Sequence, residues 1–174
     1  SISDLKEYSS EFNFTVDEID AQEIEKIAIS STKIRNSINE GDLKTTKKYL
    51  GRFFCLSGKV VKGDGLGKQI DYPTANILIE EKYKIIPKDG VYYIKTKIDN
   101  KFYNGMMNIG HRPTIGTKKK SIEVNLFNFD KDIYNKILSV DVVEKIRDEK
   151  KFSSIKALKT QLAKDEDHCL KLIN

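Results

Sequence analysis

The sequence lacks any long apolar run, and this absence excludes a large class of proteins. No stretch of its 174 residues approaches the roughly 20 consecutive apolar residues that a membrane-spanning helix needs. The first residues, SISDLKEYSSEFNF, contain neither a basic segment nor an apolar one, so they do not form a secretory signal peptide. We therefore expect a cytoplasmic protein with no membrane partner.

Cysteine and histidine are also scarce. Cys55 and Cys169 are the two cysteines, and without a secretion signal they are expected to be reduced thiols. His111 and His168 are the two histidines, a set that does not favour a zinc site. A chain of this length can bury a sufficient apolar core without disulfides or a metal.

Charge is distributed unevenly along the chain. Residues 1–29 carry eight acidic and two basic side chains, whereas the rest of the chain carries 29 basic and 18 acidic ones. This shift indicates a domain boundary near residue 30. A basic surface suits a nucleic acid and a nucleoside triphosphate equally well, and a lysine-rich surface without any such ligand is an equally good interpretation.

A strand and two short helices are predicted near the start of the chain. Residues 12–19 alternate between apolar and polar as a strand does. Ser31 or Thr32 can cap a short helix that ends at Gly41, and Asp42 can cap a second one. These helices would connect the acidic segment to the basic body.

Strand-like alternation dominates the middle of the chain. The pair Asp99-Asn100 separates two alternating runs, which is typical of a hairpin, and residues 121–129 alternate most clearly. Five or six strands at such short spacing indicate a closed antiparallel barrel. A final helix is expected after about residue 154, with an apolar stripe that is interrupted at Asp165 and Glu166. The stripe consists of Ile155, Leu158, Leu162, Cys169 and Ile173.

The loop Gly63-Asp64-Gly65-Leu66-Gly67-Lys68 suits a phosphate group. Its three glycines free backbone N–H groups to approach an anion closely, and Lys68 adds a positive charge. The loop is not a P-loop, because Lys62 stands in place of the first glycine and Gln69 replaces the serine or threonine. Taken alone, the pattern also fits a flexible hairpin loop.

Thr74 and Asn76 follow this loop two residues apart, so they share one face if a strand begins there. Their hydroxyl and carboxamide oxygens are neutral ligands that suit Mg²⁺, which usually completes its shell with water and phosphate oxygens. Local hydrogen bonds at the start of a strand would explain the same two residues without a metal.

Glu123 lies within the strand predicted over residues 121–129. By a period of two it shares one face with Asn125, Phe127 and Phe129. A carboxylate beside phenylalanines in the middle of a sheet is costly to bury without a partner. Glu123 is therefore either an exposed residue of the barrel wall or a general base.

The order and spacing of these motifs resemble those of the C-terminal part of the bacterial FAD synthetases, the bifunctional riboflavin kinase/FMN adenylyltransferases. The resemblance implies a mainly β fold: a six-stranded antiparallel Greek-key β-barrel with a C-terminal helix over residues 53–174. Before it, the resemblance implies a short α/β remnant of a nucleotidyltransferase module over residues 1–40, with linker helices to about residue 52. The matching stretches are ISSTKIR, LSGKVVKGDGLGKQIDYPTANI, GVYYIK, MNIGHRPTIG, IEVNLFNFDKDIY and IRDEKKFSSIKALKTQLAKD.

The resemblance also implies a reaction and the residues that carry it. The family phosphorylates riboflavin with ATP at the ribityl 5′-hydroxyl to give FMN, and Mg²⁺ accompanies the ATP. Glu123 matches the general base, and Thr74 and Asn76 match the contacts to Mg²⁺ and phosphate. The remaining implied site residues are Gly63, Gly65, Gly67 and Lys68 over the ATP phosphates, and Tyr72, Arg147 and Asp148 in the regions that line the flavin.

One feature of that family is missing from this sequence. Full-length FAD synthetases begin with a module that carries a His-x-Gly-His motif, which does not occur here, whereas ISSTKIR resembles the closing motif of that module. We therefore expect a piece of a longer protein, without the adenylyltransferase module in cis, that makes FMN and not FAD.

Two other functions remain open at this point. Small basic β-barrels also bind single-stranded nucleic acid on aromatic side chains, and such a barrel could bind a flavin without catalysis. Nucleic-acid binding leaves Glu123 and the Pro73–Asn76 segment without a role. We therefore expect riboflavin, FMN, ATP and ADP as partners and no nucleic acid; a steep salt dependence of oligonucleotide binding would indicate the opposite.

Overall fold

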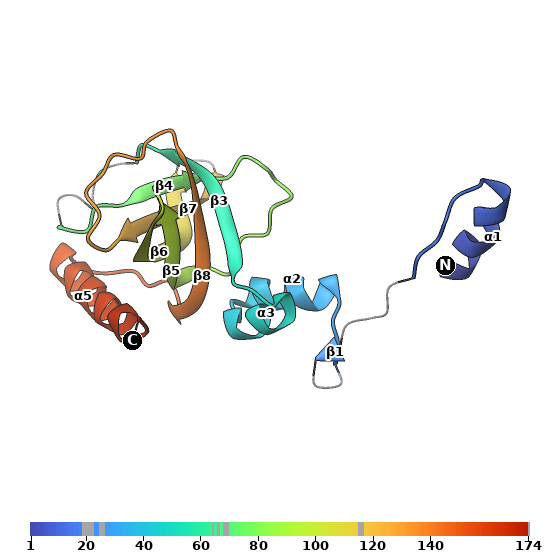
Figure 1. The fold of residues 1–174 in the computed structure, drawn as a ribbon. Coiled ribbons are helices and arrows are strands. Elements are labelled where there is room, and N and C mark those ends of the chain that lie inside the picture. The colour runs from blue at the N-terminus through green and yellow to red at the C-terminus, as the bar shows by residue number, and fades with distance from the viewer. Residues whose placement is uncertain are drawn as a thin grey trace. The chain divides into compact units, whose positions relative to one another are not determined.

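The protein consists of two compact units, Ser1–Ser31 and Thr32–Asn174 (Figure 1). The structure is a computed structural model, and it describes residues 1–18, 23–24, 27–63, 65, 67, 70–114 and 117–173. The first unit carries helix α1 (Ile2–Glu11) and a small hairpin of β1 (Glu23–Ile24) and β2 (Ile27–Ala28). The second unit carries the remaining helices and strands. Within the described residues, no helix is long and apolar enough to cross a membrane.

The strand predicted over residues 12–19 is wrong. Residues 12–18 pair with no strand that the structure describes, and position 19 lies outside the described residues. Asn13 takes a φ of 51°, in the left-handed region, which interrupts an extended backbone. The element missed by the prediction is α1, whose apolar side chains Leu5 and Tyr8 are each 51% exposed. Alternation is weak evidence for a strand that has no neighbour.

Helices α2 (Ser31–Glu40) and α3 (Leu43–Leu50) follow. Gly41 ends α2 with a φ of 77°, as the sequence predicts, and the side chain of Asp42 caps α3 by accepting a hydrogen bond from the backbone N–H of Thr45 at 3.0 Å. Ser31 lies inside α2 and so does not precede the helix as a cap. The buried side chain of Leu43 joins the core of the barrel, which anchors α3 to the body.

Six strands form a closed antiparallel barrel in the order β3-β4-β7-β6-β5-β8 (Figure 1). The hairpin-connected strands β5, β6 and β7 are followed by β8, which lies beside β5, and this arrangement is a Greek key. The predicted six-stranded barrel is therefore confirmed. The strands are β3 (Phe54–Val61), β4 (Ala75–Leu78), β5 (Gly90–Ile98), β6 (Lys101–Thr114), β7 (Thr117–Leu126) and β8 (Ile137–Arg147).

Side chains fill the interior of the barrel, and a second apolar cluster lies outside it. Leu56, Val124 and Val140 belong to the interior cluster. On the outer face, Val91, Tyr93, Met106 and Phe127 pack with Cys169 of the C-terminal helix α5 (Ile155–Lys171), as Figure 1 shows for the helix and the barrel wall. Because the interior is packed, the barrel offers a ligand its outer wall and its rims.

Candidate active site

Glu123 lies on the outer wall of the barrel. Its neighbours in β7, Ile122 and Val124, are buried in the interior cluster, so strand alternation turns Glu123 outward, where it is half-buried. In register it pairs with Asn76 of β4 on one side and Asn108 of β6 on the other. Directly paired residues share a face, so two carboxamides flank the carboxylate. These polar neighbours reduce the cost of partly burying a charge in the wall.

Phe127 and Phe129, predicted to share the face of Glu123, lie on different sides. Phe127 packs on the outer face in the cluster with Cys169, in agreement with the prediction. Phe129 packs against the interior cluster, with its ring edge-on to Tyr103 at a centroid distance of 5.0 Å. The prediction for Phe129 is wrong because β7 ends at Leu126 and the following turn, with a φ of 53° at Asn128, breaks the alternation.

A cavity of about 230 Å³ opens beside Glu123. Its walls come from the outer face of β5–β7, from the loop before β4, and from the segment that joins β8 to α5. Apolar side chains share this lining with a similar number of polar ones, among them the charged Glu149 and Lys150. A combination of apolar surface and convergent polar groups is typical of small-molecule sites. The structure brings five of the predicted site residues together in this wall: Gly67, Tyr72, Thr74, Glu123 and Arg147.

The glycine-rich loop lies directly on the start of β4. A Cβ atom added at Gly63 would overlap the carboxamide of Asn76. One added at Gly67 would overlap the carbonyl oxygen of Tyr72 and lie 3.3 Å from the Oγ1 of Thr74. Glycine at both positions therefore lets the loop backbone approach Thr74 and Asn76 closely, as expected of a loop that covers a ligand.

A larger hollow, of about 610 Å³, is also lined by Thr74. Thr74, Ala75 and Val124 border it, together with residues 129–134 of the turn after β7. Thr74 thus belongs to the walls of both cavities. A side chain shared by two cavities can contact a ligand in each, so the geometry suits the transfer of a group between two bound molecules.

Arg147 and Tyr72 are both held by α5. The guanidinium of Arg147 pairs with Asp165 through Nε at 2.9 Å and Nη2 at 2.8 Å. The hydroxyl of Tyr72 donates a hydrogen bond to Glu166 at 3.0 Å. Burial, and secondly this bond to Glu166, raise the pKa of Tyr72 to about 12. The phenol therefore stays protonated at neutral pH and keeps its role as a donor.

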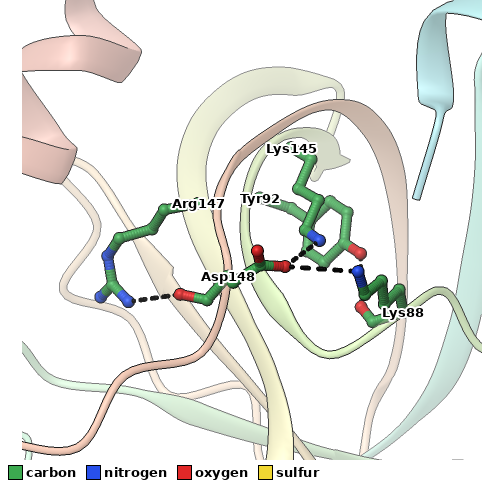
Figure 2. Close-up of polar contacts among 5 residues, drawn as sticks. All are labelled: Lys88, Tyr92, Lys145, Arg147 and Asp148. Carbon is green, nitrogen blue, oxygen red and sulfur yellow. Dashed lines mark hydrogen bonds and ion pairs between the residues drawn. The ribbon is translucent and has the colours of Figure 1, made fainter. Parts of the chain in front are cut away.

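Asp148 points away from Arg147, as Figure 2 shows. Its carboxylate lies 2.5 Å from the Nζ of Lys145 and 3.7 Å from that of Lys88, outside the wall of the cavity. The hydrogen bond from Lys145 and the nearby charges hold the pKa of Asp148 below its usual value. The backbone carbonyl of Asp148, in contrast, accepts a hydrogen bond from Nη1 of Arg147 at 3.0 Å. A role of its side chain at the flavin remains a prediction.

Lys68 lies outside the described residues, so its place over the phosphates also remains a prediction. Gly65 belongs to the same loop and has a φ of 73°, a backbone conformation that favours glycine. Neither Gly63 nor Asn76 is among the residues that line the 230 Å³ cavity; they lie against each other next to it.

Asp89, His111 and Glu149 form a further group, with donor atoms within 4.8 Å of one another, and Glu149 also lines the 230 Å³ cavity. Asp89 is already paired with Nδ1 of His111 at 2.6 Å and with the Nζ of Lys120 at 3.3 Å. Because a lysine ammonium occupies the position next to the carboxylate, we interpret this group as an ion-pair network.

Sequence reasoning missed the functional part of α5. The predicted apolar stripe included Ile155 and Ile173, which are 59% and 39% exposed, whereas Asp165, read as an interruption of that stripe, is 2% exposed. An acid within the apolar stripe of a helix needs a cationic partner when the stripe is buried. The position of Asp165 in that stripe was therefore the signal that the sequence contained. Asn125 was also missed; its amide donates to the carbonyl of Pro73 at 2.8 Å and ties β7 to the loop before β4.

Thr74 and Asn76 fit the magnesium ion that the resemblance implies. The carboxamide of Asn76 and the hydroxyl of Thr74 lie against the glycine-rich loop, and Glu123, paired in register with Asn76, adds a carboxylate nearby. Hydroxyl, carboxamide and carboxylate oxygens are the hard donors that Mg²⁺ prefers. The donor set therefore suits Mg²⁺ with phosphate oxygens as further ligands.

Fold and site together define a small β-barrel with two cavities that share Thr74, next to an outward-facing glutamate. The sequence profile of the Flavokinase family, described as riboflavin kinase, matches residues 50–173. A curated bifunctional riboflavin kinase/FMN adenylyltransferase from Bacillus subtilis (strain 168) is 38% identical over 146 residues, which cover 82% of this chain and 46% of that protein. The chain thus belongs to the riboflavin kinase family, whose members are kinases.

Two solved structures are similar in fold. One, named a macrolide-efflux protein from Streptococcus pneumoniae, is 37% identical and has a TM-score of 0.82 over 96% of this chain and 54% of its own. The other, a riboflavin kinase from Trypanosoma brucei, has a TM-score of 0.50 at 23% identity, over 70% of this chain and 80% of its own, and shows a shared fold alone. The chain spans about half the length of the curated relatives named as bifunctional.

Proposed function

We propose that this chain transfers the terminal phosphoryl group of ATP to the ribityl 5′-hydroxyl of riboflavin, giving FMN and ADP. The observation that carries the proposal is the position of Glu123 in the wall of one cavity, beside a threonine that belongs to the walls of two. The 230 Å³ cavity, which combines apolar side chains with polar ones, suits the flavin ring and its polar edge. The 610 Å³ hollow suits the nucleotide, and Gly67 of the glycine-rich loop lies beside Thr74, which borders both.

Glu123 supplies the acceptor that the alcohol needs. The ribityl hydroxyl is a poor nucleophile until its proton can leave, and a carboxylate within hydrogen-bond reach contributes about 10²–10⁴-fold in rate. The hydroxyl oxygen forms the new bond to the γ-phosphorus while the bond to the β–γ bridging oxygen breaks. The hydroxyl proton passes to Glu123, and ADP departs.

The remaining contribution is positioning and neutralisation of charge. Phosphoryl transfer depends mainly on the in-line placement of its reactants and on stabilising the phosphate oxygens. Glycines at positions 63, 65 and 67 carry no Cβ atom that would keep an anion from their backbone N–H groups, so this loop suits those oxygens. Thr74 and Asn76 would hold Mg²⁺, which neutralises phosphate charge when bound.

A product assay tests the proposal. The purified chain is incubated with riboflavin, ATP and Mg²⁺, and riboflavin, FMN and FAD are separated by chromatography with fluorescence detection. We expect FMN without FAD, and no FMN when EDTA removes the metal. Quenching of riboflavin fluorescence without FMN would refute catalysis by this chain alone. It would instead indicate a flavin-binding module, or a kinase that needs the adenylyltransferase module in cis.

A further inference from the structure

Asp165 is an acid buried in the contact between α5 and the barrel. Its side chain is 2% exposed, and its carboxylate contacts two polar side chains. Arg147 binds it through Nε and Nη2, and the amide of Gln161 donates to it at 2.8 Å. A buried carboxylate is stable when it is paired in this way, but the pair as a whole contributes little to folding compared with apolar side chains of the same volume.

The contacts of Arg147 fix its guanidinium on two sides. Nε and Nη2 bind Asp165, while Nη1 donates to the carbonyl of Asp148 at 3.0 Å. The ring centroid of Phe152 lies 5.7 Å from the guanidinium carbon, and both residues line the 230 Å³ cavity. A guanidinium has five N–H donors, so these bonds leave some of its donors for a ligand.

We propose that Asp165 is a positioning residue for the flavin, and this inference rests on the proposed function. By its two-point contact Asp165 fixes the guanidinium of Arg147 in the cavity wall, and by its charge it neutralises that guanidinium. The neutral Arg147–Asp165 pair then presents oriented N–H donors to the cavity. Such a surface suits the uncharged carbonyl groups of an isoalloxazine ring better than an isolated cation does.

The packing of α5 supports a role beyond attachment of the helix. Cys169 of α5 already packs in the outer apolar cluster, and Leu158 and Leu162 add apolar contact from the same helix at the cavity. An apolar residue at position 165 would serve attachment equally well. The Arg147–Asp165 pair points to a role at the 230 Å³ cavity, because Arg147 is part of the wall of that cavity. Neither Arg147 nor Asp165 borders the 610 Å³ hollow.

The test measures binding of riboflavin and of ATP separately, with the variant Asp165→Asn in the full chain. We expect the Kd for riboflavin, from fluorescence quenching, to rise about tenfold, because the side-chain amide cannot orient the guanidinium as a carboxylate does. The Kd for ATP, measured without turnover, is expected to stay within about twofold, since the pair lies outside the larger hollow. Asp167→Asn is the matched control, an exposed acid on the same helix, and should leave both constants unchanged.

A double-mutant cycle separates positioning from general stability. If Asp165 acts through Arg147, Asp165→Asn added to Arg147→Met should weaken riboflavin binding by less than about twofold further. A tenfold loss in that background as well would refute positioning. An equal loss of riboflavin and ATP binding in Asp165→Asn would refute it too, because it would show a general disturbance of the fold.

Two further outcomes have a defined meaning. If Asp165→Asn does not fold, Asp165→Glu is measured instead, because it keeps the charge but moves the carboxylate by one methylene. A wild-type Kd for riboflavin in Asp165→Glu would overturn the inference. If the wild-type chain binds riboflavin but makes no FMN, the proposed function fails. The quenching assay still tests the positioning of Arg147 in that case, since it requires no turnover.

Discussion

The replacement Glu123→Gln tests the chemistry most directly. Gln has the same shape and can keep hydrogen bonds to its surroundings, and Asn76 and Asn108 still flank it, so the barrel is expected to fold unchanged. What the variant loses is the acceptor for the hydroxyl proton. General-base catalysis contributes about 10²–10⁴-fold, so kcat should fall by this factor, equivalent to about 3–5 kcal/mol in the barrier.

The assay is steady-state FMN formation followed by chromatography. The KM values for riboflavin and ATP are expected to change by less than about threefold, because the missing interaction is made mainly in the transition state. Glu144→Gln, an exposed glutamate in the barrel strand β8, is the matched control and should retain wild-type turnover. If Glu123→Gln keeps turnover within a few-fold of wild type, Glu123 is not the base.

Three further predictions concern the loop, the flavin wall and the fold. Gly67→Ala places a Cβ atom against the carbonyl of Tyr72 and close to the Oγ1 of Thr74, so the loop must shift next to Thr74, which borders both cavities. We therefore expect the KM for ATP and the KM for riboflavin each to rise at least about tenfold in the FMN assay. The raised pKa of Tyr72 stabilises the fold below its unfolded pKa of about 10, and this contribution is lost as pH rises toward 12. Urea unfolding should therefore show that Tyr72→Phe loses less stability than wild type between pH 10 and 12, and an identical pH dependence would contradict this. Asp42→Ala removes the cap of α3 and should lower the free energy of unfolding by about 1 kcal/mol without changing kcat, whereas an unchanged midpoint in urea would show that the cap is dispensable.

The barrel could be predicted from the sequence because its strands obey local rules. Alternation and turn residues indicated the strands, and Asp99 and Asn100 both take the positive φ of 49° and 64° that such a hairpin turn requires. Alternation also set Glu123 on the face opposite Val124. It failed for Phe129, because a period of two carries no information past the last residue of a strand.

The wall opposite Glu123 could not be predicted in this way. Arg147 and Asp165 are 18 residues apart, in a strand and a helix, and their contact depends on how α5 docks against the barrel. Asp148 could not be placed from the sequence either. It is adjacent to Arg147 in the chain, but its carboxylate pairs with Lys145 and Lys88. Local pattern indicates which face a residue occupies, whereas tertiary packing decides which neighbour it meets.

The packed interior of the barrel explains why its site lies on the wall. A small barrel fills its interior with side chains, so an outward strand position is where it can place a polar group rigidly. A polar group on the outer wall must still be shielded from water. Here α5 and the loop before β4, which are not part of the barrel, line the cavity beside Glu123. In α5, Asp165 binds Arg147 and Glu166 binds Tyr72. Arg147 and Tyr72 both line the cavity. The same contacts therefore attach the helix and shape the 230 Å³ cavity. With riboflavin in this cavity, as proposed, a change that loosens α5 should weaken riboflavin binding more than ATP binding.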